Sequence, residues 1–201
     1  MKLLIATANR HKAEEIAALL PALGLEYRTL ADYPAVVMPE ETGSTLEENA
    51  RLKAVSAAKQ AGVWTLADDT GLEVDALGGA PGVYSARYCG RERDYEGNNR
   101  KLLSELERLG WKDVAARFRC VVCLSSPEGK ASCVEGALEG EIIRSPRGTS
   151  GFGYDPVFLV KGLGRTLAEL SFEEKNRLSH RNAALAKAAP RLSQLANSKY
   201  I

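Results

Sequence analysis

The apolar positions in the first half of the chain alternate between short runs and helical spacing. Residues 3–6 form an apolar run that predicts a strand. After a polar turn, apolar side chains recur at helical spacing until Gly24, which predicts a helix that ends there. A second helix is predicted from Ser44, which opens a capping box, to Gly62, and the apolar residues 63–67 predict the next strand.

From residue 116 the pattern changes to strands that are expected to pair as hairpins. Two strand-like runs, 116–126 and 131–143, lie on either side of the turn Pro-Glu-Gly-Lys. One helix is expected before them, over residues 98–110, and a last helix over residues 171–196. This order predicts an α/β fold with a mixed sheet, and the length fits one domain over residues 1–201, or one domain with a smaller second lobe.

The charges nearly cancel, because 27 Lys and Arg residues are balanced by 26 Asp and Glu residues, for a net charge of +1. This net charge shows no excess of basic residues that would attract duplex nucleic acid or an anionic membrane, so neither is expected as a partner. The apolar runs are too short to cross a bilayer, and the first one is too short for a signal peptide. A cytoplasmic protein is expected.

Four cysteines are present, at positions 89, 120, 123 and 133. The spacing of Cys120 and Cys123 raises the question of a metal or redox site. The surrounding sequence predicts a strand, however, and residues three apart on a strand point to opposite faces. No second pair of cysteines or histidines completes a zinc site. We therefore expect the cysteines to be buried and reduced.

Two pairs of adjacent acidic residues are candidates for chemistry. Asp68 and Asp69 follow the predicted strand at 63–67, and Glu40 and Glu41 lie together in a loop. Carboxylates from two such segments can share Mg²⁺, which would offset the repulsion between adjacent charges. Without a metal, one aspartate should have a raised pKa, which suits a general base. The alternative role for Asp68 is a turn or helix cap.

The polar turn "TANRHK", residues 7–12, is a candidate phosphate site. Free backbone N–H groups at the start of the predicted helix favour an anion. Lys12 adds a positive charge, and Thr7 and Asn9 add hydrogen-bonding side chains. The alternative is an ordinary helix start, with Asn9 as the N-cap and solvated basic residues around it.

Two later segments are candidates for binding a nucleotide base. In "GFGYDP", Phe152 or Tyr154 could stack on a base and Asp155 could bind its edge, although an ordinary turn into a core strand explains the same residues. The segment "EEKNRLSHR" gathers four basic side chains, Lys175, Arg177, His180 and Arg181. A solvated helix face explains these equally well.

Five segments occur together in an order that resembles one known family. They are "TANRHK", "PEETGSTLEENARLKA", "ADDTGLEVDALGGAPGVYSARY", "GFGYDPVF" and "EEKNRLSHR", and together they cover nearly the whole chain. Each segment is weak evidence alone, but the five in this order and spacing are very specific. The chain resembles the pyrophosphatases of non-standard purine nucleoside triphosphates, which form the inosine triphosphatase or Ham1-like family.

The resemblance implies a fold, a reaction and an assembly. The fold would be an elongated mixed sheet flanked by helices, in two lobes with an active-site cleft between them, usually as a homodimer. The reaction would be Mg²⁺-dependent hydrolysis of ITP, dITP and XTP to the monophosphate and pyrophosphate. Such an enzyme removes deaminated purines from the nucleotide pool.

The resemblance also implies roles for particular residues. Asp69 would be the proton acceptor and a Mg²⁺ ligand, with Glu40 as the other ligand and Glu41 as the alternative to Glu40. The substrate would contact the early turn, which comprises Thr7, Ala8, Asn9, Arg10, His11 and Lys12. It would also contact a later set that comprises Lys53, Thr70, Phe152, Gly153, Tyr154, Asp155, Lys175, His180 and Arg181.

Two departures from the family pattern are visible, since Ala8 stands where Gly is frequent and Thr70 where Ser is frequent. Neither removes a charge or a ligand. A buried donor aimed at C6 of the base, from Arg181, His180 or the backbone, would accept 6-keto purines and reject adenine. Three rival functions are an aspartyl-phosphate phosphatase, which needs D-x-D, a Maf-like pyrophosphatase of modified pyrimidines, and a nucleotide-binding module without turnover.

Overall fold

Strands and helices alternate through a computed structural model that describes residues 1–20 and 24–197. The strands and α-helices are, in order, β1 (Lys2–Ile5), α1 (Arg10–Leu19), β2 (Glu26–Thr29), α2 (Leu46–Ala61), β3 (Trp64–Val74), α3 (Tyr95–Arg108), β4 (Ala115–Ser125), β5 (Ala131–Ile142), β6 (Phe158–Val160), α4 (Phe172–Leu178) and α5 (His180–Asn197). Short 3₁₀ helices lie at Leu30–Asp32, Asp75–Leu77, Gly82–Arg87 and Leu167–Glu169. None of the described helices is long and apolar enough to cross a membrane.

The strands form a six-stranded sheet in the order β2-β1-β3-β4-β5-β6. β1 runs parallel to both β2 and β3, whereas β6 is antiparallel to β5. The backbone N–H of Ser126 donates to the carbonyl of Lys130 at 3.0 Å and closes the hairpin turn between β4 and β5. The predicted α/β class and mixed sheet are confirmed. The sequence pattern does not predict β2, because its four residues are all exposed or half-buried.

The described residues form two compact units that alternate along the chain. Unit 1 comprises the described residues of 1–69, 120–136 and 181–201, and unit 2 comprises 70–119 and 137–180. β3, β4 and β5 each contribute residues to both units. The chain therefore passes from one unit to the other inside these three strands and again at the start of α5, between His180 and Arg181.

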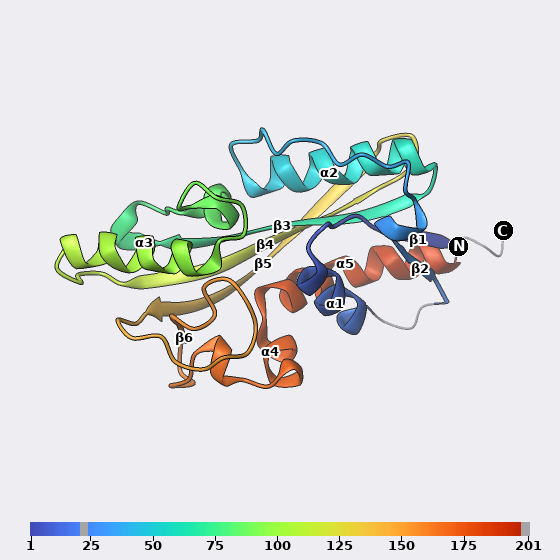
Figure 1. The fold of residues 1–201 in the computed structure, drawn as a ribbon. Helices are drawn as coiled ribbons and strands as arrows, with labels where there is room; N and C mark the ends of the chain where they lie inside the picture. The colour runs from blue at the N-terminus through green and yellow to red at the C-terminus, as the bar shows by residue number, and fades with distance from the viewer. Residues whose placement is uncertain (21–23, 198–201) are drawn as a thin grey trace. The chain divides into compact units, whose positions relative to one another are not determined.

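In unit 1, α1 and α5 cover one face of the strands and α2 covers the other (Figure 1). Leu3 and Ile5 of β1 pack in one apolar cluster with Ile16 of α1 and Leu185 of α5. Leu4 points to the opposite face because side chains alternate along a strand. On that face α2 buries a row of small residues, Ala50, Ala54, Ala57 and Ala58. This alternation decides which helix each strand residue meets.

In unit 2, α3 packs against the strands through its apolar face. Leu102 and Leu106 of α3 lie in one cluster with Leu72 of β3 and with two aromatic residues, Phe118 of β4 and Phe158 of β6. The rings of Phe118 and Phe158 are 4.8 Å apart between centroids. This cluster supports the loops of unit 2 that carry candidate site residues.

Several helix boundaries differ from the sequence prediction, and α3, predicted over residues 98–110, spans Tyr95–Arg108. α1 ends at Leu19, and Leu20 has an extended backbone with ψ 129°, as expected for the residue before a proline. The predicted end at Gly24 follows residues 21–23, which lie outside the described residues. The predicted last helix is two helices, because Ser179 has an extended backbone with ψ 152°. An extended serine is a favoured N-cap, so a new helix begins at His180.

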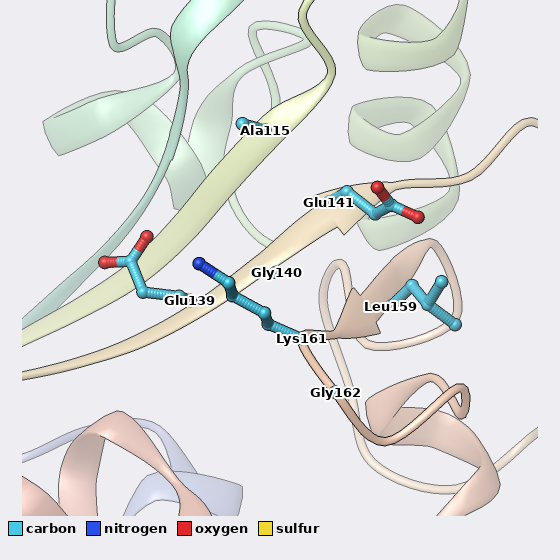
Figure 2. Close-up of a pocket in the computed structure, with 7 residues that line it drawn as sticks. All are labelled: Ala115, Glu139, Gly140, Glu141, Leu159, Lys161 and Gly162. Atoms are coloured by element: carbon cyan, nitrogen blue, oxygen red, sulfur yellow. The ribbon is translucent and has the colours of Figure 1, made fainter.

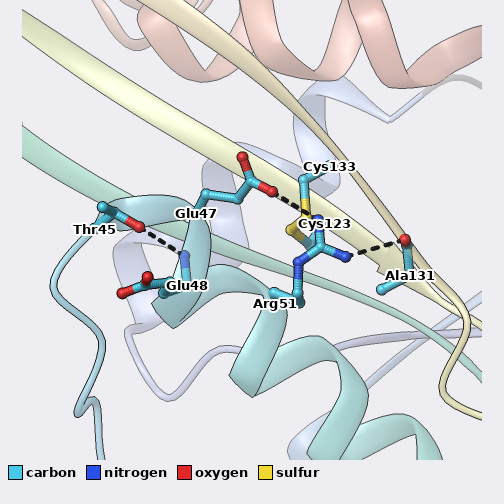
Figure 3. Close-up of a disulfide and its surroundings, with 7 residues drawn as sticks. All are labelled: Thr45, Glu47, Glu48, Arg51, Cys123, Ala131 and Cys133. Carbon is cyan, nitrogen blue, oxygen red and sulfur yellow. Dashed lines mark hydrogen bonds and ion pairs between the residues drawn. A yellow bond between two sulfur atoms is a disulfide. The ribbon is translucent and has the colours of Figure 1, made fainter.

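α2 has the predicted kinds of residue at its two ends, but its N-cap lies one residue later than predicted. The N-cap is Thr45 rather than Ser44, and its side chain accepts a hydrogen bond of 3.1 Å from the backbone N–H of Glu48 (Figure 3). Ser44 instead donates to the Glu48 carboxylate from its backbone N–H and its hydroxyl. Gly62 ends the helix as predicted, in the left-handed conformation with φ 67°.

The cysteines correct the expectation of reduced thiols. Cys123 of β4 and Cys133 of β5 form a disulfide beside α2 (Figure 3), whereas Cys89 and Cys120 are not disulfide-bonded. Cys120 lies in the apolar cluster under α1 and α5, so the prediction that Cys120 and Cys123 point to opposite faces is confirmed. The disulfide follows from the register of the β4–β5 hairpin, which brings the two Cα atoms to 4.0 Å.

Candidate functional site

Asp68 and Asp69 lie inside a strand, and not at its end as the sequence pattern indicated. β3 continues to Val74, because strand geometry persists through the charged residues. Adjacent residues of a strand point to opposite faces, so the two carboxylates enter different surroundings. Asp68 points to the same side as Leu66, which packs in the apolar cluster with α1 and α5. Asp69 points to the side covered by α2.

On the first face, Asp68 is bound by cations from two helices. Asp68 Oδ2 lies 3.2 Å from Lys12 Nζ of α1 and 3.1 Å from Arg181 Nη2 of α5. Arg181 Nη1 also donates to the Glu15 carboxylate of α1. Burial alone would raise the pKa of Asp68, but the positive charges of Lys12, Arg181 and Lys53 hold it well below its usual range. We call Lys12, Glu15, Asp68 and Arg181 the Asp68 group.

On the opposite face, Lys53 of α2 is shared by two carboxylates. Lys53 Nζ lies 2.7 Å from Asp69 Oδ1 and 2.7 Å from Glu41 Oε1. Burial opposes the charge of Lys53, but the surrounding carboxylates raise its pKa. The pKa of Asp69 is also raised, because burial and the repulsion of Glu41 outweigh the attraction of Lys53 and Lys12. We call Glu41, Lys53 and Asp69 the Asp69 group.

The Asp69 group has the chemistry that a hard divalent cation needs. Two carboxylates converge on one positive charge, the Lys53 ammonium, and Mg²⁺ also prefers carboxylate oxygens. Asp69 and Glu41 therefore fit such an ion, whereas the side chain of Glu40 is exposed. Over residues 1–20 and 24–197, no group of three or more His, Cys, Asp and Glu side chains is arranged as a metal site.

The turn at residues 7–12 has the geometry of a helix cap. The Asn9 side chain accepts hydrogen bonds from the backbone N–H groups of His11, at 3.1 Å, and Lys12, at 3.4 Å. Thr7 Oγ1 accepts a hydrogen bond of 3.2 Å from the backbone N–H of Asn9. Arg10 is exposed and pairs with Glu14. Lys12 reaches a buried carboxylate, that of Asp68.

In unit 2, the "GFGYDP" loop is organised around Asp155. Asp155 Oδ2 accepts a hydrogen bond of 2.9 Å from the backbone N–H of Phe152 and one of 2.6 Å from Lys175 Nζ. Lys175 Nζ also lies 4.7 Å from the centroid of the Phe152 ring, within cation–π range. Both charged side chains are buried. We call Phe152, Asp155 and Lys175 the Asp155 group.

Gly151 is required for this loop geometry. It has φ +76°, and a Cβ atom there would lie 2.0 Å from Asp155 Oδ2 and 3.3 Å from Lys175 Nζ. No larger residue fits without displacing the Asp155 carboxylate. The glycine thus allows the backbone to approach the ion pair closely.

Two sequence-predicted residues of unit 2 are packed in its interior. Tyr154 is buried in the apolar cluster and donates a hydrogen bond of 3.0 Å from its hydroxyl to the carbonyl of Ser85. Between the two aromatic candidates for base stacking, Phe152 is the half-buried one. His180 is buried and stacks on Phe118, with ring centroids 4.8 Å apart. Thr70 is half-buried in β3.

Three further residues, which the sequence motifs do not single out, contact these groups. Glu15 binds Arg181, Asn99 of α3 donates a hydrogen bond of 2.9 Å to the carbonyl of Gly153, and Tyr95 of α3 lies 5.9 Å from the Phe152 ring between centroids. The available signal for Glu15 was its position beside Ile16 on the buried stripe of α1, where a charge needs a partner. Tyr95 and Asn99 are four residues apart on α3, so they share one face.

A separate pocket of about 310 Å³ opens in unit 2 beside β5 and β6. Its lining includes Glu139, Glu141 and Lys161, and none of the sequence-predicted site residues. Lys161 extends toward Glu139, whereas the Glu141 carboxylate points away from both (Figure 2). This pocket is distinct from the three groups described above.

Known proteins resemble this chain over almost its full length. The dITP/XTP pyrophosphatase of Elusimicrobium minutum is 55% identical, over 96% of this chain and 100% of the relative. The dITP/XTP pyrophosphatase of Bacillus licheniformis is 49% identical, over 96% of this chain and 98% of the relative.

Solved structures and a family model agree with these relatives. A HAM1 protein from Coxiella burnetii has a TM-score of 0.89 and 41% identity, over 96% of this chain and 99% of its own. The Ham1 protein of Staphylococcus aureus has a TM-score of 0.86 and 39% identity, over 96% of this chain and 99% of its own. The model of the Ham1 family matches residues 3–191, and the chain therefore belongs to the Ham1 family.

Proposed function

We propose that this chain hydrolyses ITP, dITP and XTP to the nucleoside monophosphate and pyrophosphate, and so removes deaminated purines from the nucleotide pool. Two relatives that match it end to end carry the name dITP/XTP pyrophosphatase. The structural observation that supports this reaction is the Asp69 group. A buried carboxylate with a raised pKa lies on a lysine that it shares with a second carboxylate.

Asp69 takes the proton from the attacking water. A raised pKa makes its carboxylate a stronger base than an ordinary aspartate, while the Lys53 ammonium favours the ionised form that accepts the proton. Hydrolysis breaks the link between the α- and β-phosphates, and pyrophosphate leaves. The loss of this base should therefore affect turnover more than binding.

Asp69 and Glu41 would hold Mg²⁺, with Glu40 as the alternative to Glu41. When bound, the ion neutralises charge on the phosphate oxygens. Lys12 and Lys53 bind the phosphate groups through their ammonium charges, together with the turn at residues 7–12. The short hydrogen bonds of Lys53 and the position of Lys12 on Asp68 hold both ammonium groups in place for this role.

The Asp155 group binds the base. Phe152 stacks on the purine, and its ring is oriented by the cation–π contact with Lys175 and by the Asp155 carboxylate on its backbone N–H. Arg181, His180 and the backbone stay the candidate donors to the 6-keto oxygen, and we add Lys175 because its ammonium group lies beside the Phe152 ring. Adenine carries an amino group at C6 and would leave that donor unsatisfied.

This proposal requires that one triphosphate contact residues of both units. That requirement stays a prediction, as do the single domain with two lobes, the elongated shape, the cleft, the homodimer and the cytoplasmic location. The expected roles of Thr70 and Gly153 as substrate contacts also stay predictions.

The decisive experiment measures pyrophosphate release from ITP, dITP and XTP against ATP and GTP, with Mg²⁺ and with a chelator. We expect the three deaminated substrates to be preferred over ATP by at least about 100-fold in kcat/KM, because a mismatched buried donor discriminates strongly. Activity should disappear with the chelator. A modified pyrimidine triphosphate in the same panel serves as a negative control. Release of inorganic phosphate in place of pyrophosphate, or a preference for ATP, would contradict the proposal.

A further inference from the structure

Arg181 is one of the most deeply buried side chains of unit 1, and its charge needs an explanation. Its side chain is 1% exposed, and so is held almost wholly away from water. A buried guanidinium is costly unless carboxylates and hydrogen bonds surround it. Arg181 meets two carboxylates, Glu15 on Nη1 and Asp68 on Nη2. Asp68 lies next to the proposed base, Asp69, whereas Glu15 has no part in the reaction described above.

The two carboxylates and two cations of the Asp68 group form a chain of ion pairs. Lys12 binds Asp68, Asp68 binds Arg181, and Arg181 binds Glu15. Glu15 and Lys12 lie three residues apart on α1, so they project from the same helix face. The chain of ion pairs therefore begins and ends on α1, and it contains as many negative as positive charges.

We propose that Glu15 is a positioning residue for Lys12 and Asp68, and this inference rests on the proposed pyrophosphatase function. Glu15 accepts a hydrogen bond from Nη1 of the Arg181 guanidinium, and Asp68 accepts one from Nη2. The same Asp68 oxygen, Oδ2, then also binds Lys12 Nζ. Lys12 is thereby fixed in direction at the turn that is assigned to the phosphates.

The removal of the Glu15 charge would change how Arg181 and Lys12 share the Asp68 carboxylate. Arg181 would keep its full charge with one fewer carboxylate, and Asp68 would turn to accept from both of its terminal nitrogens. Lys12 would then lose its acceptor and its fixed direction. A misplacement of about 1 Å in a group that binds the reacting phosphates can lower turnover by up to about 100-fold.

The test uses Glu15→Gln, which keeps the shape of the side chain and removes its charge. We expect kcat for dITP to fall by about tenfold or more at a temperature where the variant is folded, with a smaller change in KM. Glu15→Asp restores the charge with a shorter side chain, and its kcat should lie between those of Glu15→Gln and the unchanged protein. Glu47→Gln is the matched control, because it removes a carboxylate from an exposed ion pair with Arg51 on α2.

A purely structural Glu15 would behave differently. Glu15→Gln would then lower the melting temperature but leave kcat unchanged in the folded protein, and this result would overturn the proposal. If Glu15→Gln does not fold, Glu15→Asp decides: a reduced kcat supports a positioning role and an unchanged kcat excludes it.

A crystal structure of a folded Glu15 variant gives a readout that does not need turnover. The distance between Lys12 Nζ and Asp68 Oδ2, 3.2 Å in the unchanged protein, should exceed hydrogen-bond range in the variant. An unchanged distance would refute the positioning role even in a protein with no pyrophosphatase activity. Conversely, a lengthened distance in a protein that does not release pyrophosphate would support the positioning of Lys12 and reject the proposed function.

Discussion

Glu41 and Asp69, which belong to a loop and a strand, bind the same ammonium group at 2.7 Å each. One lysine therefore joins a carboxylate that is 30% exposed to a carboxylate that is 7% exposed. In the proposed reaction the two acids have different tasks. Asp69 is shielded from water and has the raised pKa of a base, whereas Glu41 is open to an ion that enters from solvent.

Asp69→Asn should abolish turnover more than it affects binding. The amide keeps the shape of the carboxylate but cannot take a proton from water, so we expect kcat for dITP to fall by about 100-fold or more. The affinity for pyrophosphate, measured by calorimetry, should change much less than kcat. A variant with near-normal kcat would show that another group is the base.

Glu41→Gln and Glu40→Gln form a matched pair that assigns the second metal ligand. Glu41 shares Lys53 with Asp69, whereas the neighbouring Glu40 is exposed, so we expect only Glu41→Gln to raise the Mg²⁺ concentration for half-maximal activity, by about tenfold or more. Titration of Mg²⁺ at saturating dITP measures the effect. A larger effect in Glu40→Gln would transfer the role to Glu40.

Gly151→Ala should damage the base-binding loop through a direct collision. Its Cβ would lie 2.0 Å from Asp155 Oδ2. The ion pair with Lys175 must then move, and KM for dITP should rise by about tenfold, which corresponds to roughly 1.4 kcal/mol. Gly164→Ala is the control, because Gly164 also has a positive φ, a Cβ there meets nothing within 4 Å, and it is not among the predicted substrate contacts. Equal effects of the two substitutions would point to backbone strain as the cause.

Glu48→Gln should destabilise the protein in a pH-dependent way. Hydrogen bonds from the Ser44 hydroxyl and backbone N–H lower the pKa of Glu48 below its ordinary 4.5. A carboxylate with a lowered pKa stabilises the folded state above its unfolded-state pKa, and this contribution disappears as the pH falls through the folded-state value. The difference in Tm between the two proteins should therefore be present at neutral pH and shrink below about pH 4. A difference independent of pH would exclude the ionised cap.

The sequence predicted those features that depend on local rules. Gly62 ends α2 because only a residue that tolerates positive φ suits that position, and the alternation of Cys120 and Cys123 follows from strand geometry alone. The α/β class followed from the order of periodicities. The resemblance of five segments to a family gave the expected fold and reaction before any contact was known, and the family itself is confirmed.

The rest depends on contacts between distant segments. The pattern ended the third strand at Ala67 because charges replaced apolar residues there, but Lys12, Lys53 and Arg181 compensate those charges and allow the strand to continue. The pairing of Cys123 with Cys133 depends on hairpin register, and the break at Ser179 on a single extended backbone angle. Neither the hairpin register nor the backbone angle of Ser179 can be read from a local sequence pattern.

The opposite directions of Asp68 and Asp69 constrain how the chain can change in length. An insertion or deletion of one residue between Trp64 and Asp68 would rotate both acids by half a turn of the strand. Asp68 would then face Lys53, and Asp69 would face the apolar side chains and the Arg181 guanidinium on the opposite side of the sheet. The number of residues between Trp64 and Asp68 is thus as critical as their identity. The exposed turn at Glu128, in contrast, can accept extra residues without exchanging the surroundings of Asp68 and Asp69.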